Sequence, residues 1–465
     1  IQTAKGGGTV TDYDGNFSLS NLKVGEKLTI SYVGCKTKIV TVSNNPKLNI
    51  VLESSDKSLD EVVVIGYGTM KRRDLTGAVA SVTGDKLAQN PVSNIAEALQ
   101  GQLPGVTVTS QDGRPGASMS IRVRGGGSIT QSNDPLFIVD GVQVSSIDDI
   151  PADNVESIDV LKDAASTAIY GARGANGVIL ITTKNAKEGK VNVKYNMYFR
   201  VNEKPETYKQ ESAYDYVLRN WSYATAYNAK DGQDIARYFG VGSENGNHLE
   251  EYKSMGTHNY QDDLLGSSHS WNHDLSISGG TERTKYYATL NYINDKGSLN
   301  NTGFRRWNGN VKLTQDINKK LKWNLDARYS EMQFKGAKFE YATCSYNFRP
   351  IDTPLGEDDG SLLGLGDSHV SQSFNPVSIY DNYTSIHTRN RMRANNSLIW
   401  TPIKGLTGKT ELTLGRNWSE QKTWDGGFEE GYSHAKLKKS DGYHVKWTST
   451  INYNVQGLGK DHKLD

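Results

Sequence analysis

The second half of the sequence alternates apolar and polar residues, and this pattern limits the folds that the chain can adopt. Between residues 320 and 330, Leu321, Trp323, Leu325, Ala327 and Tyr329 fall on one face of a strand, and Lys322, Asn324, Asp326, Arg328 and Ser330 fall on the other. Residues 441–455 repeat the pattern. Such strands are typical of a transmembrane β-barrel, whose outer face meets lipid while its inner face meets water.

The same pattern predicts eight strands, at residues 191–203, 269–279, 284–295, 303–316, 321–335, 389–401, 407–420 and 441–455. The connections between them alternate in length: those at 280–283, 317–320 and 402–406 are tight, whereas those at 204–268, 296–302, 336–388 and 421–440 are mostly long. Because transmembrane barrels have short periplasmic turns and longer extracellular loops, we expect the first strand to run outward.

Membrane barrels whose lumen is filled by a separate domain have about 22 strands, many more than the eight predicted here. Eight strands would leave an open edge, and unpaired backbone groups are not tolerated in hydrocarbon. We therefore expect the chain to be a fragment that carries the N-terminal part of a barrel.

Composition agrees with a barrel and excludes other classes. Mean hydropathy is −0.61 and no apolar run approaches 18 residues, which excludes a transmembrane helix but not a barrel, in which only alternate residues face lipid. The 25 Tyr and 8 Trp residues suit the aromatic girdles of a barrel. A net charge of +1 argues against a nucleic-acid partner. Cys35 and Cys344 form no disulfide or zinc pattern, so no metal or cofactor is predicted.

The stretch from Ile121 to Thr183 has a different character. Apolar runs at Ile121–Arg124, Leu136–Val139 and Val178–Thr183 are separated by dense turn residues. Helix formers precede Gly171, which we expect to be a left-handed cap, and Ser93 is expected to cap a short helix over residues 94–100. The pattern predicts a small mixed α/β body with long polar loops. Catalytic templates fail against it, which favours an obstruction or a switch over an enzyme.

Several long motifs in this region carry a resemblance to a known family. They read LDEVVVIGYGTMKRRDLTGAVASV, GQLPGVTVTSQDGRPGASMSIRVRGGGS, PLFIVDGV and SIDVLKDAASTAIYGARGANGVILITTKN. Together they resemble the plug domain of a SusC/RagA-like TonB-dependent outer-membrane transporter. The resemblance implies a plugged barrel in the outer membrane of a Gram-negative bacterium, in contact with its lipid, that imports an oligosaccharide or a peptide. The implied protein partners are TonB, with its inner-membrane motor, and a SusD-like surface lipoprotein.

The chain is therefore predicted to be mainly β, with four parts. Residues 1–53 alternate strand-like runs with turns and predict a small β-sandwich, clipped at its front, which resembles a carboxypeptidase regulatory-like domain. Residues 54–73 form a linker, residues 74–189 a plug domain, and residues 190–465 the N-terminal part of the barrel.

One apolar run in the linker is a candidate for coupling to TonB. Its residues are Asp60, Glu61, Val62, Val63, Val64, Ile65, Gly66 and Tyr67. Four consecutive β-branched residues predict an isolated strand, and the resemblance places the TonB box here. An extended peptide of this kind binds by adding a strand to the sheet edge of a partner, through which a mechanical pull can be transmitted. The alternative is that the run is the last strand of the preceding sandwich.

Other candidate sites have weaker signals. Plug residues Ser128, Ile129, Thr130, Gln131, Ser132 and Asn133 are expected to contact a ligand. His269 and His273 are expected to pack at an interface, since no third metal ligand is near. A cluster of Tyr and Trp within residues 214–227 has helix-compatible spacing and suits local packing, glycan stacking or partner docking.

Two other function classes stay open at this point. A non-transporting adhesin or glycan-binding surface protein would need neither the plug motifs nor the coupling strand. An enzyme of carboxypeptidase type would have only residues 1–53 in its favour, and the sequence has no zinc-ligand constellation to support it.

Overall fold

The computed structural model describes residues 2–3, 8–9, 11, 15–20, 22–31, 37–42, 48, 50–52, 62–65, 68–71, 79–90, 92–110, 112–125, 132–227, 229–337, 348–351, 355–356, 376–426 and 433–453. Near the N-terminus, β1 (Gln2–Thr3), β2 (Lys27–Ile30) and β3 (Lys38–Thr41) form an antiparallel sheet in that order. Leu28 and Ile30 of β2 are buried, as expected for one layer of the predicted sandwich.

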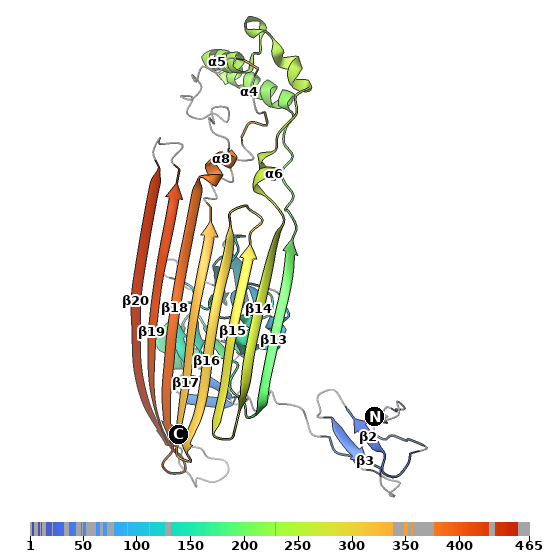
Figure 1. The fold of residues 1–465 in the computed structure, drawn as a ribbon, viewed down its shortest axis with the longest axis vertical. Coiled ribbons are helices and arrows are strands. Elements are labelled where there is room, and N and C mark those ends of the chain that lie inside the picture. The colour runs from blue at the N-terminus through green and yellow to red at the C-terminus, as the bar shows by residue number, and fades with distance from the viewer. Residues whose placement is uncertain are drawn as a thin grey trace.

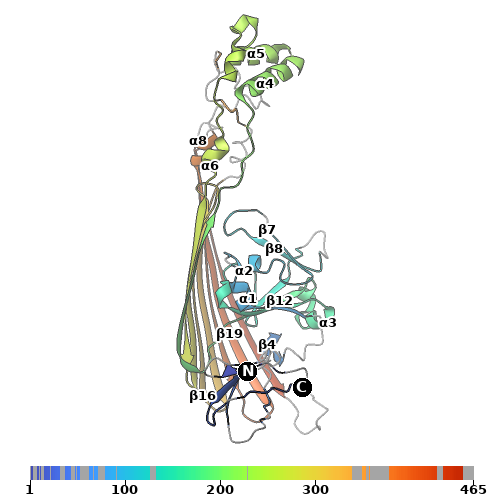
Figure 2. The same cartoon turned by 90° about the vertical axis from the view of Figure 1, so that its right-hand side faces the viewer.

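The predicted coupling segment contains a strand, but the strand is not isolated. β4 (Val62–Ile65) pairs antiparallel with β5 (Gly68–Lys71) in a register that runs from Val62 opposite Lys71 to Ile65 opposite Gly68. β4 therefore joins the residues that follow it, and does not extend the three-stranded sheet. It lies beneath the α/β body, near β12 (Figure 2). Asp60, Glu61, Gly66 and Tyr67 lie outside the described residues.

Residues 79–183 form the α/β body that the sequence predicts, called the plug body below. Its five-stranded sheet has the order β10-β9-β12-β11-β6, in which β9 and β12 are parallel and the other neighbours are antiparallel. The strands are β6 (Val79–Thr83), β9 (Leu136–Val139), β10 (Val142–Val144), β11 (Val155–Leu161) and β12 (Val178–Thr183). A separate hairpin joins β7 (Val106–Ser110) to β8 (Met119–Val123). Short helical segments complete the body: α1 (Gly84–Ala88), α2 (Ile95–Ala98), η2 (Ala152–Asn154), α3 (Ala164–Thr167) and η3 (Ala168–Gly174).

The plug body has a hydrophobic core of its own. Leu87, Ile95 and Leu99 from the helical side pack with Ile158 and Ile179 of the sheet, and all five are fully buried. A smaller cluster under η3 covers the other face of the sheet. The plug body therefore buries its apolar residues without help from the rest of the chain, which leaves polar residues for its outer surface.

Two local predictions for the plug body are wrong. The cap of α2 is Asn94, whose side-chain oxygen accepts from the Ala96 N–H at 2.9 Å, and not Ser93. Ser and Asn are both favourable N-cap residues, so the sequence alone does not show which of these two neighbours caps the helix. Gly171 has φ 60° and ψ −148°, which is not the left-handed helical conformation of a cap. It instead joins two helical turns at a kink, which glycine allows because it has no Cβ.

All eight predicted barrel strands are present, and they form one antiparallel sheet, called the wall below (Figure 1). They follow chain order: β13 (Gly189–Asn202), β14 (Ser268–Gly280), β15 (Thr284–Lys296), β16 (Gly303–Asn318), β17 (Leu321–Gly336), β18 (Tyr383–Trp400), β19 (Leu406–Asp425) and β20 (His434–Tyr453). β13 and β20 are the two edges. The wall is therefore part of a barrel.

The wall carries polar residues on its inner face and apolar residues on its outer face, the reverse of a sheet that covers the core of a water-soluble protein. On the face toward the plug body, Asn272, Asp274 and Asn308 are buried polar residues, whereas Trp271 and Leu275 on the other face are exposed. This is the distribution required of strands that meet lipid outside and a filled lumen inside. Among the described residues, no helix is both long enough and apolar enough to cross a membrane.

The strand connections sort by length to opposite ends of the wall, as predicted. Helices α4 (Ala213–Tyr227), α5 (Ala229–Phe239), α6 (Tyr260–Leu264) and α8 (Pro376–Asp381) lie at the end with the long connections (Figure 1), together with η4 (Ser243–Asn245) and η5 (His248–Lys253). β18, β19 and β20 extend further toward this end than predicted. Their extensions carry charged residues such as Lys439, paired with Glu420 at 3.0 Å, so apolar alternation does not mark them.

Candidate functional site: the interface between the plug body and the wall

The plug body lies against the concave face of the wall (Figure 2), and the two surfaces meet mainly through polar groups. The contacts join residues from distant parts of the sequence. We describe this interface as the candidate functional site because any movement of the plug body relative to the wall must break it.

Asp140 is the centre of the first contact group. It occupies a two-residue turn between Val139 and Val142, where Asp140 has φ 49° and Gly141 has φ 83°. Positive φ at both positions is typical of a type I′ hairpin turn, for which Asp-Gly is a preferred sequence. The Asp140 carboxylate accepts hydrogen bonds from the Thr183 N–H at 2.9 Å and the Thr183 hydroxyl at 2.7 Å. Asp140 is therefore fixed within the plug body, with one carboxylate oxygen directed at the wall.

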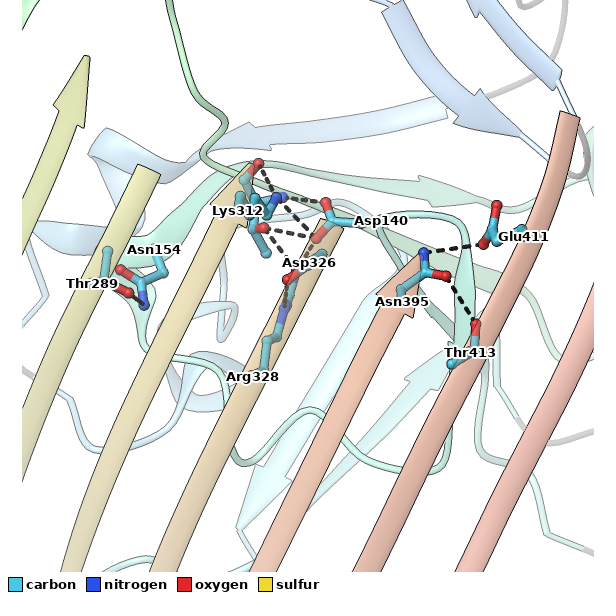
Figure 3. Close-up of polar contacts among 10 residues, drawn as sticks. Asp140, Asn154, Thr289, Lys312, Asp326, Arg328, Asn395, Glu411 and Thr413 are labelled. Carbon is cyan, nitrogen blue, oxygen red and sulfur yellow. Dashed lines mark hydrogen bonds and ion pairs between the residues drawn. The ribbon is translucent and has the colours of Figure 1, made fainter. Parts of the chain in front are cut away.

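Two cations of the wall meet that oxygen (Figure 3). Lys312 of β16 places Nζ 3.2 Å from Asp140 Oδ2, and the Arg328 guanidinium of β17 contacts the same atom. Arg328 also pairs with Asp326 at 2.7 Å, two residues earlier on the same face of β17. Burial alone would raise the pKa of Asp140, but Lys312 and Arg328 outweigh it and hold that pKa below its usual range.

A second contact group lies nearer the end with the long connections. Buried Arg306 of β16 donates to the carbonyl oxygens of Ser93 at 3.0 Å and Asp148 at 2.8 Å. The Ser93 hydroxyl in turn donates to Asp295 of β15. Ser93 therefore anchors the plug body to the wall in place of its predicted capping role. Because the Arg306 guanidinium binds two backbone carbonyl oxygens, any shift of this part of the plug body along the wall would break both hydrogen bonds.

Further contacts extend this attachment across the wall. Asn308 donates to the Asp149 carbonyl oxygen at 2.7 Å, and Arg391 of β18 pairs with the Asp149 carboxylate at 2.9 Å. Near β15, Asn154 of the plug body donates to the Thr289 hydroxyl at 3.1 Å (Figure 3). These contacts combine main-chain and side-chain acceptors, so they fix the orientation of the plug body as well as its distance from the wall.

The interface is not fully satisfied. Within the described part of the chain, the Oδ1 atoms of Asn154, Asn308 and Asn310 are buried without a hydrogen-bond partner. Each such atom costs about 1–3 kcal/mol relative to a paired one.

A cavity of about 390 Å³ lies between the plug body and the wall where β13 and β15 approach the long connections. The plug body contributes Glu97 of α2, and Asp112 and Arg114 between β7 and β8; the wall contributes Arg200 and Asp295. Arg200 pairs with Asp295 at 3.3 Å, and Arg114 pairs with Asp112 at 2.6 Å. Burial raises the pKa of Glu97.

Of the predicted ligand-contacting residues, only Ser132 and Asn133 are described, and neither lines this cavity. Ser128, Ile129, Thr130 and Gln131 are outside the described residues. The Ser132 hydroxyl donates to Asp134 at 2.7 Å, and its carbonyl oxygen accepts from Asn176 at 3.0 Å. Ser132 and Asn133 are thus held before β9, and the lining of the cavity comes from other residues. Their role in binding a ligand stays a prediction.

The remaining sequence candidates lie on the outer face of the wall and in α4. The Tyr195 hydroxyl lies 2.7 Å from His273 Nδ1 on the outer face of the wall, and His269 lies beside Trp271. In α4, Tyr216 is buried in a helical cluster, while Tyr223 and Tyr227 are exposed and stacked 6.3 Å apart. The described part of the chain contains no group of three or more His, Cys, Asp or Glu side chains that could hold a metal ion.

The fold and this interface define a membrane barrel with a separate body in its lumen. The comparisons with known proteins agree: residues 71–178 match the TonB-dependent Receptor Plug Domain, and residues 1–64 match the CarboxypepD_reg-like domain. TonB-dependent receptor P26 of Formosa agariphila is 37% identical over 80% of this chain and 36% of its own length. TonB-dependent receptor SusC of Bacteroides thetaiotaomicron is 34% identical over 69% of this chain and 31% of its own length.

The fold has been solved in a relative. The structure of the RagAB peptide importer in its open-open state aligns with a TM-score of 0.70 and 24% identity, over 87% of this chain and 48% of that one. The chain belongs to the SusC/RagA-like TonB-dependent receptors of the outer membrane, a family of receptors and transporters, not of enzymes. It spans about a third of the length of the curated relatives that it matches.

Sequence reasoning missed the residues that join the plug body to the wall. Lys312 and Arg328 stand at polar positions of alternating strands, so their direction toward the lumen was predictable. Asp140 was predicted only as part of a turn. A charged residue on the lumen face of a strand indicates that a partner exists, and this signal could have identified Lys312 and Arg328 as candidates.

Proposed function

We propose that this chain carries the plug and the adjoining wall of a TonB-dependent importer, which moves a nutrient across the outer membrane. The proposal rests on the difference between the interior of the plug body and its contact with the wall. The plug body has its own apolar core, while its contact with the wall is made by ion pairs and hydrogen bonds. Such a body can shift as a unit within the lumen and keep its fold.

In this proposal, ligand on the outer side displaces the plug body, and the segment Asp60–Tyr67 becomes available to TonB on the inner side. β4, the described strand of this segment, lies at the end of the wall with the tight turns (Figure 2). That end is periplasmic in transmembrane barrels. TonB would add its own strand to this segment and pull on the plug body.

Release of β4 has a modest cost. Among the described strands, β4 pairs only with β5, in a two-stranded sheet, and an isolated two-stranded hairpin is marginally stable in water. A partner that supplies a new sheet edge can replace the backbone hydrogen bonds that β4 gives up. The β4–β5 hairpin therefore supports a coupling segment that stays paired until TonB binds it.

The cargo is proposed to be an oligosaccharide or a peptide, and Ser128–Asn133 are proposed to contact it. A relative of the same fold is a peptide importer, which supports cargo of this size. A SusD-like lipoprotein is proposed to cover the long connections, where α4 and α5 lie beyond the end of the wall (Figure 1). The exposed rings of Tyr223 and Tyr227 offer such a partner an apolar contact.

The coupling segment provides the test. In the full-length transporter, deletion of Asp60–Tyr67 should abolish uptake of the cargo and leave its equilibrium binding to purified protein unchanged. Val64→Pro should have the same effect, because proline removes an N–H from the strand. Val64→Thr is the matched control and should transport normally, since threonine also favours strands. Normal uptake by the deletion variant would refute the assignment.

A further inference from the structure

A long cleft separates the plug body from the last strands of the wall. Its upper part is a cavity of about 450 Å³ between β10 and strands β17 to β20, and its lower part is a cavity of about 290 Å³ between β9, η3 and strands β19 and β20. Gln143, Arg173 and Lys446 line both cavities, so the two are adjacent. The cleft extends along the strands toward the end with the tight turns.

The upper cavity is strongly basic. Its lining includes Arg173, Arg328, Arg391, Arg393 and Lys446, with Asp149 as the one carboxylate. Lys312, Asp140 and Asp326 lie just behind it. With these included, six positive charges face three negative ones. In the lower cavity Lys409 pairs with Glu411, so that part adds no net charge.

Some of these cations are already used to hold the structure together. Arg328 pairs with Asp140 and Asp326, and Arg391 pairs with Asp149. Arg393 and Lys446 differ from them: among the described residues, neither forms an ion pair or a hydrogen bond. Among the described residues, Arg173 bonds only to the neutral amide of Gln143, at 3.0 Å. Within that part of the chain, none of these three cations forms an ion pair, although Asp149, Asp326 and Asp140 lie near enough to Arg393 to favour its charge.

The direction of the two wall cations is fixed by the strands that carry them. On β18, Met392 is exposed on the outer face, so its neighbour Arg393 lies on the inner one. On β20, Val445 and Trp447 are exposed outside and Lys446 between them lines the cleft. Both cations are half-buried and face the plug body across the cleft.

We propose that this cleft binds the oxyanion groups of the cargo, so that the imported molecule is an anionic oligomer bearing carboxylate, sulfate or phosphate groups. The inference rests on the proposed import function and names the chemistry of its cargo. Arg393, Lys446 and Arg173 supply the charge, and Asn417 and Gln143 supply neutral polar groups beside it. Guanidinium groups match oxyanions with paired donors, which gives both affinity and orientation.

The test is equilibrium binding to the purified full-length transporter, with probes of matched size. One pair is the hexamer of galacturonic acid and its uncharged methyl ester; the other is hexaglutamate and hexaglutamine. A charged probe should bind at least tenfold more tightly than its neutral partner, with an affinity that falls as salt rises. Sodium sulfate should compete beyond its effect as a salt.

Substitutions of cleft residues test whether the charged probe binds in the cleft. Arg393→Gln and Lys446→Gln should each weaken binding of the charged probe about tenfold, the loss of one charge-assisted hydrogen bond. Arg393→Lys keeps the charge and should retain most of the affinity, which separates charge from packing. Arg416→Gln is the matched control: Arg416 lies on the opposite face of β19 from Asn417, pairs with Asp441 at 2.7 Å, and should not affect binding.

The outcomes are decisive. Preference for either charged probe, reduced in the two Gln variants, supports the proposal, and the probe that binds distinguishes an acidic sugar from an acidic peptide. Equal binding of charged and neutral probes, binding of none of them, or unchanged affinity in both Gln variants overturns it. Uptake is measured separately in cells, so charged probes that bind in this way without being imported would refute the import function and leave the anion site standing.

Discussion

The plug body meets two different stretches of the same wall, and the difference between them suggests how it moves. Along β16 and β17 it is held by buried contacts: Asp140 with Lys312 and Arg328, and Arg306 with two backbone carbonyls. Along β19 and β20 two adjacent cavities lie between the surfaces. The attached side fixes where the plug body sits, while the cleft side leaves space beside it.

This asymmetry has an energetic basis. Buried ion pairs cost desolvation, which their attraction offsets only with good geometry, so a few well-formed contacts are easier to build than an interface around the whole lumen. Contacts confined to one side can also open in sequence when the body is pulled. We therefore expect perturbations of the attached side to change transport most.

The largest effect should come from a covalent lock on the attached side. Asn154→Cys combined with Thr289→Cys places two thiols where a 3.1 Å hydrogen bond now joins the plug body to β15. With Cys35 and Cys344 replaced by serine, oxidation should abolish uptake and reduction should restore it. Each single cysteine variant is the control and should transport under both conditions. Normal uptake with the disulfide formed would show that the plug body need not leave β15.

A smaller effect is expected from Asp140→Asn. The change leaves Lys312 without its carboxylate and Arg328 with Asp326 alone, which should weaken the attachment of the plug body by about 3 kcal/mol. Ion conductance of the full-length protein in planar bilayers should rise as the plug body opens more often. Asp134→Asn is the matched control, because Asp134 is exposed on the same body and, among the described residues, its hydrogen bonds are with Ser132. Equal conductance of both variants would contradict the role of Asp140.

The smallest effect is a dependence on pH at the cavity beside Arg200. Burial raises the pKa of Glu97 above its ordinary value of 4.5, so the folded state favours the protonated form. This contribution to stability is fully present below pH 4.5 and is lost as the pH rises through the folded-state pKa. Glu97→Gln imitates the protonated acid, so thermal unfolding of the variant should depend less on pH between 4.5 and 7. An unchanged pH profile would show that Glu97 is solvated.

The sequence predicted the architecture through local and periodic signals. Alternation in segments such as 320–330 gave all eight strands of the wall, because a strand that separates lipid from a filled lumen must change polarity at every residue. The lengths of the connections gave the correct grouping of loops, and long motifs gave the plug. The predicted ends of β19 and β20 were short, because beyond the membrane both faces of a strand are polar.

The candidate site could not be predicted in the same way. Asp140 and Arg328 are separated by 188 positions, and Ser93 and Asp295 by 202. Periodicity tells which face of a strand carries Arg328, but not which plug residue lies opposite it. The helix cap could not be predicted for the same reason. The Ser93 hydroxyl donates to Asp295 across the interface, and Asn94 caps the helix instead.

The sequence by itself determined a wall with one apolar and one polar face, an α/β body with its own core, and which end of the wall carries the long loops. These depend on residues close in the chain, whose spacing is set by backbone geometry. Only the tertiary structure decided which side of the plug body is attached and which side faces the basic cleft. That decision depends on how two separately folded surfaces meet, and no local pattern records it.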